Sequence, residues 1–217
     1  MHRKKLMFLV IGLAILVSLS VIAAFYMSLQ NIIRVACVGD SITEGTYYPI
    51  DLEILLGTNY SVGNFGVGGS AVSLDSGKPY MNEDAFQGAK AFQPNIVLIM
   101  LGANDASPLN SPSNDSFVEG YVQLIGAFQM LSSKPKMYIV KPPPVFSDET
   151  GLNPEFFLKN IIPNIEKVAE QTNLPIIDAY SALTNNSNLF PDGVHPNAEG
   201  AQLIANTIYQ AITQHPN

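Results

Sequence analysis

The chain has 217 residues, of which 47% are apolar and 13% are charged, and its formal net charge is −7. This length favours a single globular domain, and the apolar content is too high for a disordered chain. Because three of the 11 basic residues are Arg3, Lys4 and Lys5, the rest of the chain carries 8 basic and 18 acidic residues, a net charge of −10. Such an acidic body argues against a nucleic-acid partner, which would require clustered basic side chains.

The first element in chain order is an uncharged, strongly apolar segment at residues 6–27. Its length predicts a membrane-spanning helix, and the basic residues ahead of it favour an orientation that places the remaining chain outside the cytoplasm. Residues 1–30 are therefore expected to be a signal anchor or a signal peptide; we favour the anchor because the apolar run exceeds a usual signal core. The rest of the chain would be membrane-anchored and extracytoplasmic, or secreted if the segment is cleaved. Three Asn-x-Ser/Thr tripeptides agree with this location, at Asn59, Asn114 and Asn185.

From residue 31 onward, short apolar runs alternate with amphipathic stretches. Strands are predicted at 33–38, 61–65, 96–101, 137–140 and 176–177, and helices at 49–56, 116–132, 155–171 and 197–213. This alternation predicts an α/β fold with a central parallel sheet that helices cover on both faces. Ligands bind at the carboxyl ends of the strands in such folds. Two polar connections that follow strand ends, at about 70–83 and 105–115, are therefore expected to form the substrate rim.

Three short blocks directly follow predicted strands. In Gly39-Asp40-Ser41, the serine hydroxyl can point out of the sheet edge and its N–H can face a developing anion, although a helix-cap serine looks the same. Asn64-Phe65-Gly66-Val67-Gly68-Gly69 offers a backbone N–H with no side chain to block a substrate, or a plain turn. In Gly102-Ala103-Asn104-Asp105, the Asn104 amide can donate to an oxyanion or form a local turn.

One of the three histidines, His195, lies inside the predicted body. It follows Asp192 by three residues, and this spacing lets the carboxylate meet one imidazole nitrogen while the other stays free to act as a general base. The alternative is a turn aspartate beside an incidental histidine. Tyr47, Tyr48 and Tyr80 lie near the predicted site and are expected either to stack on a sugar or to pack in the core.

The blocks Gly-Asp-Ser, Asn-x-Gly-x-x-Gly, Gly-x-Asn-Asp and Asp-x-x-His occur in this order, and together they resemble the four-block pattern of the SGNH hydrolases, or GDSL-type esterases and lipases. The resemblance extends from about residue 33 to the C-terminus. The residues around the blocks look most like the carbohydrate-esterase and sialate O-acetylesterase branch of the family. The resemblance implies a three-layer, flavodoxin-like α/β/α fold, in which residues 31–217 form the catalytic domain after an N-terminal hydrophobic helix.

The same resemblance implies specific roles for the block residues. Ser41 would be the nucleophile, His195 the general base and Asp192 the carboxylate that orients the imidazole. The oxyanion hole would consist of the Ser41 and Gly69 N–H groups and the Asn104 amide, with Asp40 and Asp105 as supporting hydrogen-bond acceptors.

By this resemblance the protein hydrolyses O-acyl esters, above all O-acetyl esters, of a glycan or a small molecule through an acyl-enzyme, without a metal or cofactor. A lysophospholipase or thioesterase of the same fold remains an alternative. A membrane-tethered glycan-binding module without catalysis is the alternative from another class of protein.

Overall fold

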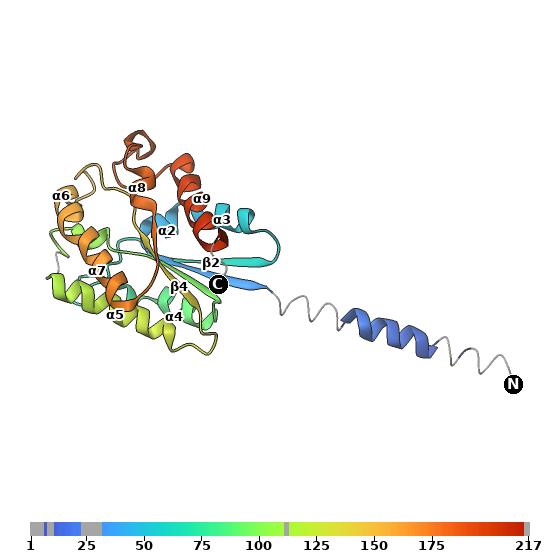
Figure 1. The fold of residues 1–217 in the computed structure, drawn as a ribbon. Coiled ribbons are helices and arrows are strands. Elements are labelled where there is room, and N and C mark those ends of the chain that lie inside the picture. The colour runs from blue at the N-terminus through green and yellow to red at the C-terminus, as the bar shows by residue number, and fades with distance from the viewer. Residues whose placement is uncertain (1–6, 8–10, 23–31, 111–112, 215–217) are drawn as a thin grey trace. The chain divides into compact units, whose positions relative to one another are not determined.

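The computed structural model describes residues 7, 11–22, 32–110 and 113–214 (Figure 1). The chain divides into two compact units, Met1–Ile32 and Ile33–Asn217. In the first unit, residues 11–22 form a helix, whereas residues 6, 8–10 and 23–27 of the predicted apolar segment lie outside the described residues. No helix within the described ranges is long and apolar enough to cross a membrane.

The second unit is built on a five-stranded sheet in the order β2-β1-β3-β4-β5, and all neighbouring strands are parallel. The strands are β1 (Ile33–Gly39), β2 (Tyr60–Gly66), β3 (Ile96–Met100), β4 (Lys136–Lys141) and β5 (Ile176–Asp178). Gly39 at the end of β1 pairs with Gly66 of β2 and Met100 of β3, so these three strands end together. The chain passes from β1 to β2 on one side and then to β3 on the other, which creates a topological switch point between β1 and β3.

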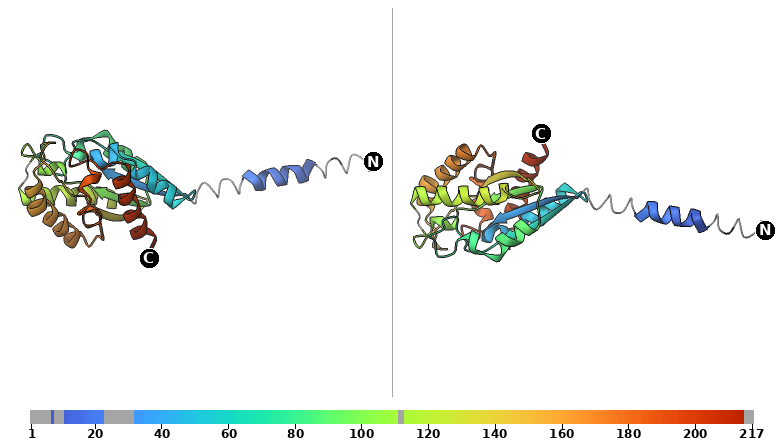
Figure 2. Two further views of the ribbon diagram at one scale, coloured as in Figure 1. Left: turned by 90° about the horizontal axis from the view of Figure 1, so that it is seen from above. Right: turned by 90° about the horizontal axis from the view of Figure 1, so that it is seen from below.

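Helices cover both faces of the sheet (Figures 1 and 2). One face packs against α4 (Asp84–Ala91), α5 (Asn114–Gln129) and α7 (Ile162–Thr172), and the other against α3 (Tyr48–Leu56), α8 (Ala179–Leu183) and α9 (Ala198–Gln214). Successive β1 residues alternate between the two cores, because side chains of a strand point to opposite faces. Coverage on both faces explains why the strands are continuous apolar runs. The predicted α/β fold with a central parallel sheet is confirmed.

The predicted strands and helices of this unit are present, with ends displaced by a few residues, but the helix predicted at 155–171 is divided. It consists of α6 (Pro154–Phe156), a wider π-type turn at Phe157–Ile161, and α7. Pro163 accounts for the division, because it lacks an N–H donor and its ring clashes with the carbonyl four residues earlier. Three helices, α2 (Ser41–Gly45), α4 and α8, are not among the predicted elements. These are short, and α4 buries only Phe86 and Ala89, so their apolar periodicity is weak.

Candidate active site

Ser41 is the first residue of α2 and lies directly beyond the carboxyl end of β1. The preceding Asp40 caps this helix, because its Oδ1 accepts a hydrogen bond of 3.0 Å from the Ile42 N–H. Gly39 permits the tight turn between strand and helix, since a Cβ there would lie 2.7 Å from the Cβ of Thr43 and 2.8 Å from the Met100 carbonyl oxygen. Ser41 therefore stands at the switch point between β1 and β3, where ligands of such sheets bind.

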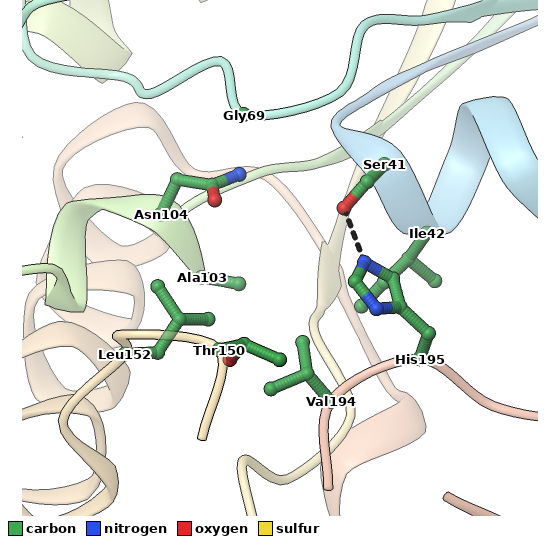
Figure 3. Close-up of a pocket in the computed structure, with 9 residues that line it drawn as sticks. All are labelled: Ser41, Ile42, Gly69, Ala103, Asn104, Thr150, Leu152, Val194 and His195. Atoms are coloured by element: carbon green, nitrogen blue, oxygen red, sulfur yellow. Dashed lines mark hydrogen bonds between the residues drawn. The ribbon is translucent and has the colours of Figure 1, made fainter. Parts of the chain in front are cut away.

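The loop before α9 places His195 against Ser41, although 154 positions separate them in the chain. Ser41 Oγ lies 2.7 Å from His195 Nε2 (Figure 3), and His195 Nδ1 lies 2.6 Å from Asp192 Oδ2. A proton on Nδ1 satisfies the carboxylate and leaves Nε2 as the acceptor for the Ser41 hydroxyl. The structure thus brings these three sequence-predicted residues into one hydrogen-bonded chain.

Asp192 forms the turn and contacts the imidazole at the same time. Its Oδ1 accepts hydrogen bonds from the backbone N–H groups of Val194, at 2.9 Å, and His195, at 2.7 Å, while Oδ2 faces the ring. Partial burial raises the pKa of Asp192, but these hydrogen bonds outweigh it and lower the pKa to about 2. The carboxylate is therefore ionised at neutral pH and favours the Nδ1–H tautomer of His195.

Two further carboxyl groups, Asp40 and Asp105, are buried behind the site. Burial raises the pKa of Asp40 to about 6, and its Oδ2 has no hydrogen-bond partner among the described residues. Burial raises the pKa of Asp105 to about 7, although it accepts hydrogen bonds from the N–H groups of Val72, at 2.9 Å, and Ser73, at 3.1 Å. Asp105 thereby connects the end of β3 to the loop that follows Gly69.

Gly69 and Asn104 lie across the same pocket from His195 (Figure 3). The Asn104 amide donates one hydrogen bond of 3.0 Å to the Ser70 carbonyl, which orients the amide and leaves its second N–H free to donate. Gly69 has a φ of 76°, a backbone conformation that favours glycine. Its N–H meets no protein acceptor within the described part of the chain. Two donors therefore belong to residues that line the same pocket as Ser41.

The pocket has a volume of about 250 Å³, and its apolar wall consists of Ile42, Ala103, Leu152 and Val194. Leu152 and Thr150 belong to a loop after β4 that was not predicted to contribute to the site. This loop is tied to the His195 turn, because the Phe146 N–H donates to the Gly193 carbonyl at 2.7 Å. No local pattern predicts such a contact, since its partners are distant in the sequence.

The surroundings of the pocket decide between alternatives that the sequence left open. The described residues of the connections 70–83 and 105–115 do not line this pocket, but Pro108 lines a neighbouring pocket that shares Leu152 with it. The first connection packs its backbone against the buried Asp105. Tyr48 and Tyr80 are 0% and 1% exposed, which excludes stacking on a sugar, and Tyr47 is exposed but does not line the pocket. No group of three or more His, Cys, Asp or Glu side chains in the described ranges is arranged to hold a metal ion.

The model of the GDSL-like Lipase/Acylhydrolase family matches residues 37–203, which include all four blocks. An acetylxylan esterase from Xylanibacter ruminicola is 34% identical over 209 aligned positions, which cover 84% of this chain and 44% of that protein. A GDSL esterase/lipase from Arabidopsis thaliana is 20% identical over 158 positions, 62% of either protein. The chain thus spans less than half of the first relative and about three fifths of the second.

Similar solved structures include a carbohydrate acetylesterase family member from Sinorhizobium meliloti, with a TM-score of 0.65 and 20% identity over 84% of this chain and 98% of that one. A carbohydrate esterase family 3 protein from Talaromyces cellulolyticus has a TM-score of 0.64 and 21% identity over 84% of this chain and 97% of that one. At such identities the likeness shows the fold alone. The acetylxylan esterase relative confirms the resemblance to the carbohydrate-esterase branch, and the match of the family model over most of the chain shows that this protein belongs to the GDSL-like lipase/acylhydrolase family.

Proposed function

We propose that this protein is a serine esterase that removes O-acyl groups, above all O-acetyl groups, from glycans. The observation that carries the proposal is the hydrogen-bonded chain from Ser41 through His195 to Asp192, with separations of 2.7 and 2.6 Å. This chain opens into a pocket that Gly69 and Asn104 also line. A hydroxyl beside an oriented base, with donors across the same cavity, is the arrangement that acyl transfer requires.

In the proposed reaction, Ser41 Oγ attacks the ester carbonyl carbon while its proton passes to His195 Nε2. The carbonyl oxygen becomes an oxyanion that accepts hydrogen bonds from the N–H groups of Ser41 and Gly69 and from the Asn104 amide. When the tetrahedral intermediate collapses, the bond to the alcohol oxygen breaks and the His195 imidazolium returns the proton to that oxygen. Water then repeats the sequence on the acyl-enzyme, which releases the carboxylic acid and restores Ser41.

The size of the pocket supports a short acyl group. Its volume of about 250 Å³ has to hold the acyl chain, the reacting carbonyl and part of the alcohol. Pockets for larger ligands range from roughly 300 to 1,000 Å³. The acetylxylan esterase relative supports acetyl as the acyl group and a glycan as the alcohol.

The test is hydrolysis by the full chain of p-nitrophenyl acetate, butyrate, octanoate and palmitate, together with acetate release from acetylated xylan. We expect kcat/KM to be highest for the acetyl ester and to fall steeply with acyl length. A preference for long chains would favour the lysophospholipase or thioesterase alternative. Absence of hydrolysis at every length, with retained binding to the glycan, would favour a non-catalytic module.

A fluorophosphonate probe tests the nucleophile itself. We expect Ser41→Ala to abolish both hydrolysis and covalent labelling, because no hydroxyl then lies beside His195 Nε2. Ser132→Ala is the matched control, since Ser132 is exposed and its hydroxyl contacts Gln93 instead. Labelling that persists in Ser41→Ala would show that another residue is the nucleophile.

We further propose that the catalytic unit acts outside the cytoplasm. The proposal rests on the uncharged segment at 6–27, which follows the basic residues Arg3, Lys4 and Lys5. An intact-mass measurement on the natural protein separates the two forms of this proposal. A mass that includes residues 1–30 is expected for the anchor, and a mass without them for the secreted form. Recovery of the protein from the cytoplasm alone would contradict both forms.

A further inference from the structure

We propose that Lys78 and Glu44 are positioning residues that aim the Gly69 N–H at the oxyanion, an inference that rests on the oxyanion role proposed for Gly69. Both side chains form hydrogen bonds with the backbone of Gly68, the residue immediately before Gly69. Lys78 Nζ donates a hydrogen bond of 2.8 Å to the Gly68 carbonyl oxygen. The Gly68 N–H donates a hydrogen bond of 2.8 Å to Glu44 Oε2. Gly68 is therefore anchored through both of its backbone polar groups.

The anchor on the Gly68 carbonyl also determines the direction of the Gly69 N–H. These two groups belong to the same peptide unit, and in a planar trans peptide the C=O and N–H bonds point in opposite directions. When Lys78 draws the carbonyl to one side, the Gly69 N–H has to point to the other. Because Gly69 lines the pocket and its N–H has no protein acceptor in the described part of the chain, we place the oxyanion on that side.

Glu44 connects this donor to the nucleophile, because Ser41 and Glu44 lie three residues apart on the same short helix α2. A Cβ added at Gly68 would lie 2.7 Å from Glu44 Oε2 and 3.7 Å from Ser41 Cβ. The carboxylate and the nucleophile thus both approach Gly68. One helical turn therefore sets the distance between the attacking hydroxyl and the peptide that carries the donor.

Lys78 is itself held in place by its backbone. The Ala71 N–H donates to the Lys78 carbonyl at 2.9 Å, and the Tyr80 N–H donates to the Ala71 carbonyl at 2.9 Å. These bonds close the loop of residues 71–80 on itself, and the Lys78 side chain reaches from it back to Gly68. Such an external anchor matters because consecutive glycines have more backbone freedom than other residues, whereas an oxyanion donor is most effective when it is oriented before the reaction.

The test compares Lys78→Met, which removes the donor, with Lys78→Arg, which keeps a cationic donor. For Lys78→Met we expect kcat on p-nitrophenyl acetate to fall about 5- to 50-fold, less than for removal of a donor, because the N–H is misdirected rather than lost. KM and the unfolding temperature should change little, and Lys78→Arg should restore most of kcat. Lys167→Met is the matched control, because Lys167 is an exposed residue of α7 that pairs with Asp115.

Binding of phenylboronic acid gives a readout that a purely structural role would not affect. This compound forms a tetrahedral adduct with an active-site serine, so its affinity should fall with kcat in Lys78→Met. If Lys78→Met does not fold, Glu44→Ala tests the second anchor with the same expected losses, and Glu44→Gln, which keeps an acceptor oxygen, should retain kcat.

Wild-type kcat in both Lys78→Met and Glu44→Ala, or a loss confined to KM, would overturn the positioning roles. That outcome is distinguishable from failure of the proposed esterase function. If wild-type protein hydrolyses the ester and Ser41→Ala does not, only the inference about Lys78 and Glu44 is wrong. If wild-type protein hydrolyses no ester, both the function and the positioning roles are wrong.

Discussion

Asp192→Asn would separate the two tasks of the Asp192 carboxylate. In the wild-type protein the backbone N–H groups of Val194 and His195 donate hydrogen bonds to Asp192 Oδ1. The amide oxygen of the variant can still accept both hydrogen bonds. The amide nitrogen would replace Oδ2, which lies 2.6 Å from His195 Nδ1, and it would donate to Nδ1 instead of accepting from it. The imidazole proton would then move to Nε2, which could no longer accept the proton of Ser41.

The expected loss of activity is large and the expected loss of stability is small. We expect kcat to fall about 10³- to 10⁴-fold, which corresponds to roughly 4 to 5.5 kcal/mol of activation free energy. Folding lowers the pKa of Asp192 from 3.8 to about 2. The ionised carboxylate therefore stabilises the folded state above pH 4, and this contribution is lost as the pH falls towards 2. Because the side chain is 44% exposed, solvent screening reduces the contribution to about 1 kcal/mol.

The assay combines kcat on p-nitrophenyl acetate with thermal unfolding at pH 7. A loss of about 1 kcal/mol lowers the unfolding temperature of a protein of this size by about 2 to 4 °C. Asp115→Asn is the control, since this carboxylate is 88% exposed and lies on α5. A kcat within tenfold of wild type would refute the argument that Asp192 sets the His195 tautomer. A much larger fall in unfolding temperature would contradict the expectation that an acceptor oxygen in the place of Oδ1 preserves the turn.

Three further predictions concern the donor side of the pocket, the buried carboxyl groups and the His195 turn. Asn104→Ala should lower kcat about 100-fold or more with the fold intact, because one oxyanion donor is lost; nearly unchanged turnover would remove Asn104 from the site. Burial raises the pKa of Asp40 to about 6, so the folded state binds more protons than the unfolded state, and the free energy of unfolding should decrease as the pH rises from about 4 to 6. Asp40→Asn should flatten this decrease in urea titrations, and an identical slope would contradict the assignment. Gly193→Ala should lower both kcat, by at least about tenfold, and the unfolding temperature, because Gly193 has a φ of 79° and a Cβ there would collide with the Ser147 side chain. Gly126→Ala, whose Cβ would meet nothing within 4 Å, is its control, and equal kcat and unfolding temperatures in the two variants would contradict the prediction.

Much of the fold is readable from the sequence because it depends on local patterns. A strand buried on both faces has to be continuously apolar, and alternation of such strands with amphipathic helices leads to a parallel sheet. Parallel strands bring their carboxyl ends to one edge, so the blocks that contain Ser41 and Asn104, which follow β1 and β3, could be assigned to the ligand-binding edge of the sheet. The Asp192-x-x-His195 spacing is also local, because one turn brings the two side chains into contact.

Features of the site that depend on contacts between distant segments could be found only in the tertiary structure. The separation of Ser41 and His195, the wall formed by Leu152, and the reach of Lys78 to Gly68 follow from how loops from different strands meet above the sheet. The sequence also did not predict whether Tyr48 is buried, since an apolar ring with a polar end suits both a core and a sugar site. In the structure Tyr48 is fully buried. Local patterns encode backbone conformation and the buried face of each element, whereas these contacts depend on packing between elements, which no short stretch of sequence specifies by itself.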